Sequence, residues 1–175
     1  KIKQGTVSRL LKELKKRGEN ADDYKKFWEA FGAAFKEGIY EDFTNRNEVA
    51  ELSRFYSTNS EDQLTSLDEY ISRMGEEQKC IYYITGDDIP TLRNNPQLEA
   101  FYAKGLEVLL LTDPIDEFWP QVLTSYKDKA IKHVSQANED LKVKRDEPKA
   151  EEGSLDKLVT FMADVLKNEV GKVES

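Results

Sequence analysis

The chain has 175 residues, of which 38% are hydrophobic, so it can bury one ordinary core or two small ones. Its formal net charge of −8 excludes a general electrostatic attraction to nucleic acid or to anionic lipid, and we expect neither as a partner. No apolar stretch approaches the roughly 20 residues of a membrane span, and the basic start lacks the apolar core of a secretory signal.

Residues 1–76 predict a helical connector that begins with two amphipathic helices. Apolar side chains recur at helical spacing over residues 2–17 and Gly18 follows, so a first helix is expected there. The chain starts without a methionine, directly in this helical pattern, so we also expect a part excised from a longer protein. A second helix, after Asp22, carries an aromatic stripe: Tyr24, Phe27, Trp28, Phe31 and Phe35. The strict spacing and the acidic charge favour packing in the core over a base-stacking surface.

Two shorter helices are expected in the rest of this connector. Thr44 or Asn45 can cap the first of them. Residues 66–69 have the pattern of a capping box, which predicts that the second helix begins there. The polar segment 57–63 between these helices predicts a loop.

Residues 77–137 predict a small α/β subdomain. Two apolar runs, at 79–88 and 106–116, each have the pattern of a buried parallel strand, and the crossover of about 20 residues between them is long enough for a right-handed βαβ unit. Residues 130–135 offer a third, more polar strand after a helix that we expect to begin near Trp119, because the proline after it lacks a donor N–H. We therefore predict an α/β fold in which a three-layer αβα unit holds a three-stranded, mostly parallel sheet.

The last part of the chain predicts a linker and a helix. Residues 138–153 are charged and nearly free of aromatic side chains, which indicates a linker. Residues 154–175 predict the start of a further domain, with a helix capped by Ser154. The apolar stripe of this helix needs a partner, either a domain outside this chain or a symmetry mate. The stripe consists of Leu155, Leu158, Val159, Met162, Val165 and Leu166.

Acidic residues and threonines follow both predicted strands, at the end where open α/β sheets usually bind ligands. They are Thr85, Asp87, Asp88, Thr112, Asp113 and Asp116. One hypothesis is a phosphoacceptor or Mg²⁺-dependent site that uses Asp87 and Asp113. The other is that these side chains cap helices. Capping is favoured, because the sequence has no glycine-rich phosphate loop and the pattern places no lysine or hydroxyl beside the aspartates.

The lone histidine and the lone cysteine give no sign of a reactive site. His133 is the only histidine, so a multi-histidine metal site is excluded, and its place in a polar strand disfavours general-base work. Cys80 opens an apolar run, which predicts an inert, buried thiol in a reducing compartment. Together with the missing membrane span and secretory signal, this predicts a soluble intracellular protein. From these patterns we predict no catalytic, cofactor-binding or metal-binding residue in the chain.

Four segments of the chain resemble the heat shock protein 90 chaperone family, in the family's order. The longest reads LTSLDEYISRMGEEQKCIYYITGDD, over residues 64–88, and is similar to the family's middle-domain signature. The others are GIYEDFTNR at 38–46, RFYST at 54–58 and LEVLLLTDPIDEFW at 106–119. The sequences of these segments are most similar to the bacterial, HtpG-like branch of the family or to an organellar relative. The resemblance covers essentially the whole chain.

The resemblance implies a part of a homodimeric, ATP-dependent chaperone that has ATP and Mg²⁺ as its cofactors. The chain would be the later half of the middle domain, followed by the first helix of the C-terminal dimerisation domain. The family's nucleotide-binding motifs, and the arginine that reaches the ATP γ-phosphate, lie upstream of the residues matched here, so we expect no ATP hydrolysis by this part. The implied partners are unfolded or partly folded client proteins and co-chaperones, in a bacterial cytoplasm or an organelle, and the part alone is expected to be a monomer.

The resemblance also implies a client-binding segment at the junction of the middle and C-terminal domains. The segment matches residues 116–119, where Glu117, Phe118 and Trp119 place a charge beside aromatic area suited to loosely structured clients. The competing interpretation is that Trp119 packs on the sheet, and we expect one of the two aromatic side chains to be buried and the other exposed. A purely structural spacer without client binding is a third hypothesis.

Overall fold

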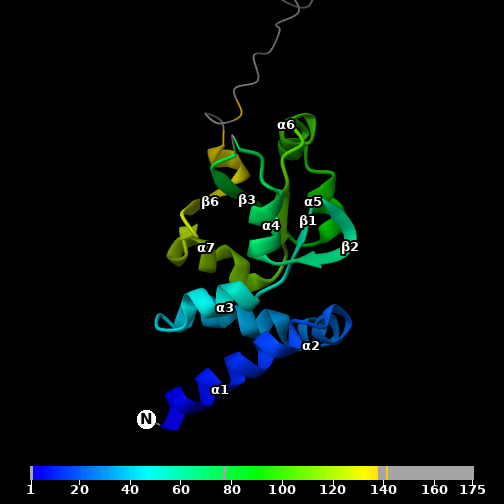
Figure 1. Ribbon diagram of the computed structural model, residues 1–175. Helices are drawn as coiled ribbons and strands as arrows, with labels where there is room; N and C mark the ends of the chain where they lie inside the picture. Colours follow the sequence, from blue (N-terminus) through cyan, green and yellow to red (C-terminus); the bar gives the residue numbers. More distant parts are fainter. Residues whose placement is uncertain (1, 77, 138–140, 142–175) are drawn as a thin grey trace, which may run out of the picture. The chain divides into compact units, whose positions relative to one another are not determined.

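The computed structural model describes residues 2–76, 78–137 and 141 (Figure 1). The chain divides into two units, residues 1–141 and 142–175, and every described residue belongs to the first unit. The predicted charged linker, apart from Leu141, and the predicted C-terminal helix therefore lie outside the described residues.

Three helices open the chain, as the periodicity of the sequence predicts. They are α1 (Ile2–Arg17), α2 (Ala21–Glu41) and α3 (Arg46–Leu52), drawn in blue to cyan in Figure 1. The side chain of Asn20 caps α2 by accepting a hydrogen bond from the backbone N–H of Asp23 at 3.1 Å. The aromatic stripe of α2 is only partly in the core, because Tyr24 and Trp28 are buried whereas Phe31 is 61% exposed.

A short antiparallel hairpin follows these helices, where the sequence predicted a polar loop at 57–63. It consists of β1 (Phe55–Ser57) and β2 (Ser60–Thr65), and β1 also pairs with a strand of the main sheet. The prediction of a purely helical connector over residues 1–76 is therefore wrong in this segment. Successive polar side chains of β2 face solvent, which removes the apolar alternation by which a strand is recognised.

Helix α4 (Leu67–Arg73) begins at the predicted capping box. The Ser66 hydroxyl accepts a hydrogen bond from the backbone N–H of Glu69 at 3.1 Å, and the Glu69 carboxylate accepts one from the backbone N–H of Ser66 at 2.7 Å. Leu67 and Tyr70 on this helix are both 0% exposed. The cap thus fixes where the helix starts, and its buried face attaches it to the core.

Among the described residues, the sheet has six strands in the order β2-β1-β4-β3-β6-β5. Its centre is the parallel set β4 (Val108–Leu111), β3 (Cys80–Thr85) and β6 (Lys129–His133), which correspond to the three predicted strands. Antiparallel strands extend this centre, β1 and β2 on one side and β5 (Ser125–Tyr126) on the other. The mixed α/β fold is confirmed, and the prediction of a three-stranded sheet is wrong.

Alternate side chains of the central strands face two separate cores. Ile81 and Leu109 pack with the helices α1 to α4, whereas Tyr82 and Leu110 pack on the other face with side chains of α5 and α6. Helices therefore cover both faces of the sheet (Figure 1). The remaining helical elements are α5 (Ile89–Arg93), η1 (Pro96–Leu98), α6 (Glu99–Ala103), η2 (Pro114–Glu117), α7 (Trp119–Val122) and η3 (Val134–Gln136). Within the described ranges, no helix has the length and apolar character needed to cross a membrane.

Candidate functional site

Residues 113–119, which we call the 113–119 turn, join β4 to α7 and carry a buried ion pair with α2. Asp116 is 0% exposed, and its carboxylate oxygens Oδ1 and Oδ2 lie 2.7 and 2.6 Å from Nζ of Lys36. Lys36 is 4% exposed, and its ammonium also lies 2.7 Å from Oδ2 of the partly exposed Asp113. Charges taken out of water need partners, so these three side chains form one structural unit.

Asp116 also organises the backbone and the buried aromatic side chain of the turn. Its Oδ2 accepts a hydrogen bond from the backbone N–H of Asp113 at 2.9 Å, and its Oδ1 accepts one from the indole Nε1 of Trp119 at 2.7 Å. The Trp119 ring is fully buried, with its centroid 5.6 Å from that of Phe55. Helix α7 begins at Trp119, as predicted, with Pro120 in its first turn. A carboxylate, an indole and an ammonium therefore hold the turn from the inside.

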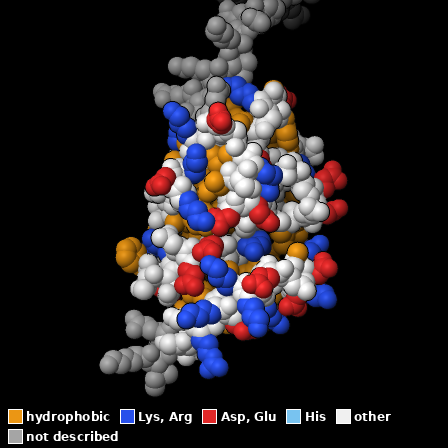
Figure 2. All heavy atoms as spheres, viewed as in Figure 1, with side chains coloured by type: hydrophobic (Ala, Val, Ile, Leu, Met, Phe, Trp, Pro, Cys, Tyr) orange, Lys and Arg blue, Asp and Glu red, His pale blue; other side chains and the backbone are white. Residues whose placement is uncertain are grey.

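Phe118 lies on the outer side of the same turn. Its side chain is 50% exposed, and its ring meets that of Tyr40 edge to face, with 6.2 Å between the centroids. Tyr40 and the adjacent Glu117 are also exposed. Of the two aromatic side chains in the predicted segment, Trp119 is thus the buried one and Phe118 the exposed one, which confirms the expectation that they differ. On the face shown in Figure 2, hydrophobic side chains reach the surface in small patches between charged ones.

A groove of about 790 Å³ opens between the helices α1 and α3 and residues 122–128. Phe43 lies on its wall with 82% exposure, and the guanidinium of Arg46 lies 5.3 Å from the centre of the Phe43 ring. Lys15 and Glu51, also on the wall, form an ion pair at 2.7 Å. Paired charges and an open shape give this groove no feature that selects a small-molecule ligand.

The hypothesis of an acidic reaction site at Asp87 and Asp113 is not supported. Asp113 lies against the ammonium of Lys36, and Asp87 is exposed. Asp88 caps α5 by accepting hydrogen bonds from the backbone N–H of Thr91 at 2.8 Å and from its hydroxyl at 2.7 Å, and these bonds lower the pKa of Asp88. In the part of the chain that the structure describes, no group of three or more His, Cys, Asp or Glu side chains could hold a metal. Asp88 thus serves as a cap and Asp113 as a partner of a lysine, an arrangement that does not fit Mg²⁺.

The remaining candidates from the sequence occupy structural positions. Thr85 is the last residue of β3 and Thr112 follows β4, and both are half-buried. Cys80 is 5% exposed in β3, which confirms the prediction of a buried thiol. His133 ends β6 with its Nδ1 2.8 Å from the hydroxyl of Ser135, and burial lowers the pKa of its ring. None of these contacts places a reactive group at a cleft.

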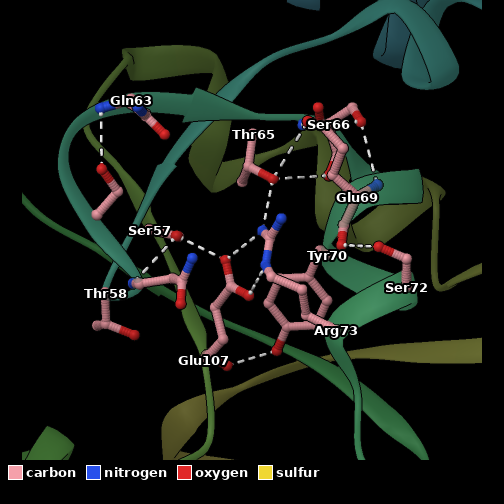
Figure 3. Close-up of polar contacts among 12 residues, drawn as sticks. Ser57, Thr58, Gln63, Thr65, Ser66, Glu69, Tyr70, Ser72, Arg73 and Glu107 are labelled. Atoms are coloured by element: carbon pink, nitrogen blue, oxygen red, sulfur yellow. Dashed lines mark hydrogen bonds and ion pairs between the residues drawn. The ribbon is translucent and has the colours of Figure 1, made fainter.

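A second polar network fastens the β1–β2 hairpin to α4 and to the start of β4 (Figure 3). Nε and Nη2 of Arg73 donate hydrogen bonds to Oε2 and Oε1 of Glu107 at 2.9 and 2.8 Å, a two-point pairing. Glu107 also accepts a bond from the hydroxyl of Ser57 at 2.6 Å, and Nη2 of Arg73 donates to the hydroxyl of Thr65 at 2.7 Å. These groups bond to one another across the fold, so we assign the network to stability rather than to ligand binding.

Lys36 and Tyr40, which both reach the 113–119 turn from α2, were not predicted from the sequence. The buried face of α2 consists of Tyr24, Trp28, Gly32, Lys36 and Ile39. A lysine on such a stripe signals a buried carboxylate somewhere in the fold, because a buried charge requires a partner. The partner itself, Asp116, lies 80 residues further along the chain, and no local pattern connects it with Lys36.

Comparisons with known proteins agree on one family. The family model described as Hsp90 protein matches residues 1–175. Chaperone protein HtpG of Paramagnetospirillum magneticum is 51% identical over 168 residues, which cover 93% of this chain and 27% of that protein. Chaperone protein HtpG of Ehrlichia ruminantium is 44% identical over an alignment that covers 99% of this chain and 30% of that protein. The chain therefore spans less than a third of the length of these relatives.

A solved structure gives the same indication from the fold. The middle domain of a Plasmodium falciparum heat shock protein superposes with a TM-score of 0.72 at 40% sequence identity. The match covers 76% of this chain and 56% of the other. Sequence and fold thus point to the same part of the same kind of protein.

Proposed function

The chain belongs to the Hsp90 protein family, so we propose that it works as a middle-domain part of a longer molecular chaperone, contributing client contact and interdomain coupling. Its relatives are named chaperone protein HtpG, and its structural neighbour is a middle domain. Because the chain covers only 27% of the Paramagnetospirillum relative, assisted folding is proposed as an activity of the longer protein.

ATP hydrolysis, with ATP and Mg²⁺ as cofactors, is likewise proposed for the longer protein and not for this chain. The sequence has no glycine-rich phosphate loop. Asp113 and Asp116 are paired with Lys36, so they do not fit a metal-bound nucleotide. We extend the proposal to a homodimeric chaperone that also binds co-chaperones, in a bacterial cytoplasm or an organelle.

One observation carries the proposal of client contact. A buried ion pair and the buried indole of Trp119 hold the 113–119 turn, while Phe118, the residue directly before Trp119, is 50% exposed. An aromatic ring kept at the surface can bury apolar area of a partner without a shape-matched pocket. The exposed Glu117 adds a charge beside the ring, and Tyr40 extends the aromatic area. Such a surface suits an unfolded segment that has mixed apolar and charged side chains.

The burial of Trp119 narrows the predicted client-binding segment. Its ring is 0% exposed and its indole N–H is used by Asp116, so it has no free surface to offer a client. We therefore assign client contact to Glu117 and Phe118, with Tyr40 as an addition that the sequence did not indicate. Trp119 takes the supporting position beneath them.

A binding measurement with one truncated aromatic side chain tests this proposal. The probe is reduced, carboxymethylated α-lactalbumin, which stays unfolded in native buffer, and the readout is its dissociation constant from the 175-residue chain. Phe118→Ala is expected to weaken binding by about fivefold or more, because it removes the exposed ring from the surface. Phe31→Ala is the matched control, since Phe31 is 61% exposed on α2 but does not belong to the turn.

Two results would contradict the proposal. Equal binding by the Phe118→Ala variant and the unchanged chain would remove the surface and favour the structural spacer, which predicts no client binding. Equal losses in the Phe118→Ala and Phe31→Ala variants would show that any exposed ring serves, so that the 113–119 turn has no special role.

A further inference from the structure

We propose that Lys36 is the positioning residue of the 113–119 turn, and that its ion pair with Asp116 links α2 mechanically to the client-contact surface. The inference rests on the client contact proposed above and names the side chain that sets its geometry. Lys36 itself is 4% exposed and does not touch a client. It acts through Asp116 and Trp119.

The contacts form an unbroken sequence from α2 to the exposed ring. Nζ of Lys36 lies within 2.7 Å of both carboxylate oxygens of Asp116, and one of these oxygens accepts the indole N–H of Trp119 at 2.7 Å. Phe118 immediately precedes Trp119, and its backbone N–H donates to the carbonyl of Ile115 at 3.0 Å. With the indole fixed on one side and the backbone on the other, the direction of the Phe118 side chain is determined.

Helix α2 reaches the turn at two points that lie one helical turn apart. Lys36 binds it from the inside, and Tyr40, four residues later on the same face, packs against Phe118 with 6.2 Å between ring centroids. A displacement of α2 therefore acts on both the support and the exposed ring. This pair of contacts is a physical route by which movement of the N-terminal helices reaches the surface.

Stability alone does not explain a lysine at this position. A buried ion pair pays a desolvation cost for both charges, and an apolar pair of similar volume is often as stable or more stable. The charged pair fixes the geometry of the 113–119 turn, because the carboxylate of Asp116 accepts hydrogen bonds from Lys36, from the indole of Trp119 and from the backbone N–H of Asp113. A methionine would fill the space of Lys36 without directing the carboxylate.

The test compares removal of the buried charge of Lys36 with the same substitution at an exposed lysine of α2. Lys36→Met removes the ammonium, and the double variant Lys36→Met with Asp116→Asn removes both charges while keeping an acceptor for the indole N–H of Trp119. The second variant guards against unfolding caused by an unpaired buried carboxylate. Lys26→Met is the matched control, because Lys26 is an exposed lysine of the same helix.

Two readouts separate positioning from general loss of structure. The first is the affinity for reduced, carboxymethylated α-lactalbumin, measured with and without Phe118→Ala in the same chain. The second is the ¹H–¹⁵N resonance of the Trp119 indole, for which the indole of Trp28 serves as an internal reference, since both tryptophans belong to the same core.

The expected result is a loss of affinity in the double variant of about fivefold, no larger than that of Phe118→Ala, together with no loss in Lys26→Met and no further loss when Phe118→Ala is already present. The Trp119 resonance should shift while that of Trp28 stays in place. Unchanged affinity in the double variant, with weakened binding by Phe118→Ala, would overturn the positioning role and leave the proposed function standing. Additive losses would also overturn it, since Lys36 would then act independently of Phe118. If Phe118→Ala binds as tightly as the unchanged chain, the proposed function fails and the positioning role falls with it.

Discussion

Nζ of Lys36 lies 2.6 Å from Oδ2 of Asp116, although 80 residues separate the two in the chain. The ammonium also lies 5.7 Å from the centre of the Phe55 ring at the start of the hairpin. One side chain of α2 thus contacts the turn after β4 and the first strand of the chain. In these buried surroundings each charge depends on its partner far more than it would in water.

Lys36→Met is expected to lower the free energy of unfolding by about 3–5 kcal/mol, because it leaves the carboxylate of Asp116 buried without its cation. Lys26→Met on the exposed face of the same helix should change it by less than about 0.5 kcal/mol. Urea unfolding followed by circular dichroism measures both values. Similar urea midpoints for the two variants would show that the ion pair of Lys36 and Asp116 does not contribute measurably to the free energy of unfolding.

Lys36→Met combined with Asp116→Asn is expected to unfold at a higher urea concentration than Lys36→Met alone. The double variant removes both charges, so no uncompensated ion remains in the core. A double-mutant cycle gives the coupling free energy between Lys36 and Asp116, which should be at least about 1 kcal/mol. A coupling near zero would mean that the two side chains contribute independently.

Two neighbouring aromatic residues should respond differently to truncation. Trp119→Ala is expected to lower the free energy of unfolding by about 3–5 kcal/mol, because it leaves a large cavity and removes a donor from Asp116. Phe118→Ala should lower it by less than about 1 kcal/mol, since the ring is already 50% exposed. Thermal or urea unfolding of both variants checks the contrast, and comparable losses would contradict the assignment of one ring to the core and the other to the surface.

The capping box of α4 should make the stability of the fold sensitive to acid. Burial opposes ionisation of Glu69, but hydrogen bonds from the backbone N–H and the hydroxyl of Ser66 outweigh it and hold the pKa of Glu69 below its ordinary value of 4.5. A carboxyl group whose pKa is lowered by folding stabilises the folded state fully when the pH lies above the pKa that this group has in the unfolded chain. The stabilisation is lost as the pH falls through the lower pKa that the group has in the folded chain.

Glu69→Ala should therefore cost about 1 kcal/mol at neutral pH, and the difference from the unchanged chain should shrink as the pH falls below about 4.5. Urea midpoints measured at several pH values give the difference directly. Glu37→Ala, at an exposed position of α2, is the control. A difference that stays constant over the whole pH range would show that the ionised carboxylate is not the group responsible.

The pairing of Arg73 with Glu107 should be measurable as a coupling energy. Arg73→Ala and Glu107→Ala are each expected to cost about 1–3 kcal/mol, and the double variant should cost at least about 1 kcal/mol less than their sum. The pair of Lys25 and Glu29, 3.9 Å apart and about half exposed, is the control and should couple by about 0.5 kcal/mol or less. Equal couplings would contradict the view that the first pair fastens the hairpin.

The helices and the central strands could be predicted because their signals are local. The apolar spacing of α1, the capping box at residues 66–69 and the apolar runs of β3 and β4 each lie within a few residues. The start of α7 at Trp119 also followed from one proline and its missing N–H. In all these cases residues close together in the sequence restrict the local structure to few alternatives.

The hairpin and the inner side of the site could not be predicted, because they depend on partners distant in sequence. Strand β1 becomes part of the main sheet through β4, where Tyr56 lies beside Leu110 and Ser57 beside Leu109. The resemblance implied a client-binding segment at residues 117–119 with one of its two rings buried, but which ring turns inward depends on the bond between Trp119 and Asp116. No pattern within either segment contains that information.

The two ends of the sheet limit how an extended chain can meet it. In the part of the chain that the structure describes, the sheet ends on one side in β2, where Glu61, Asp62 and Gln63 are exposed in succession. On the other side it ends in β5, which has two residues. A long apolar edge strand invites another chain to add a further strand and so begins aggregation. Here one edge repels such a chain by charge and the other is too short to guide it. A protein proposed to handle unfolded polypeptides thus avoids becoming a template on which they assemble.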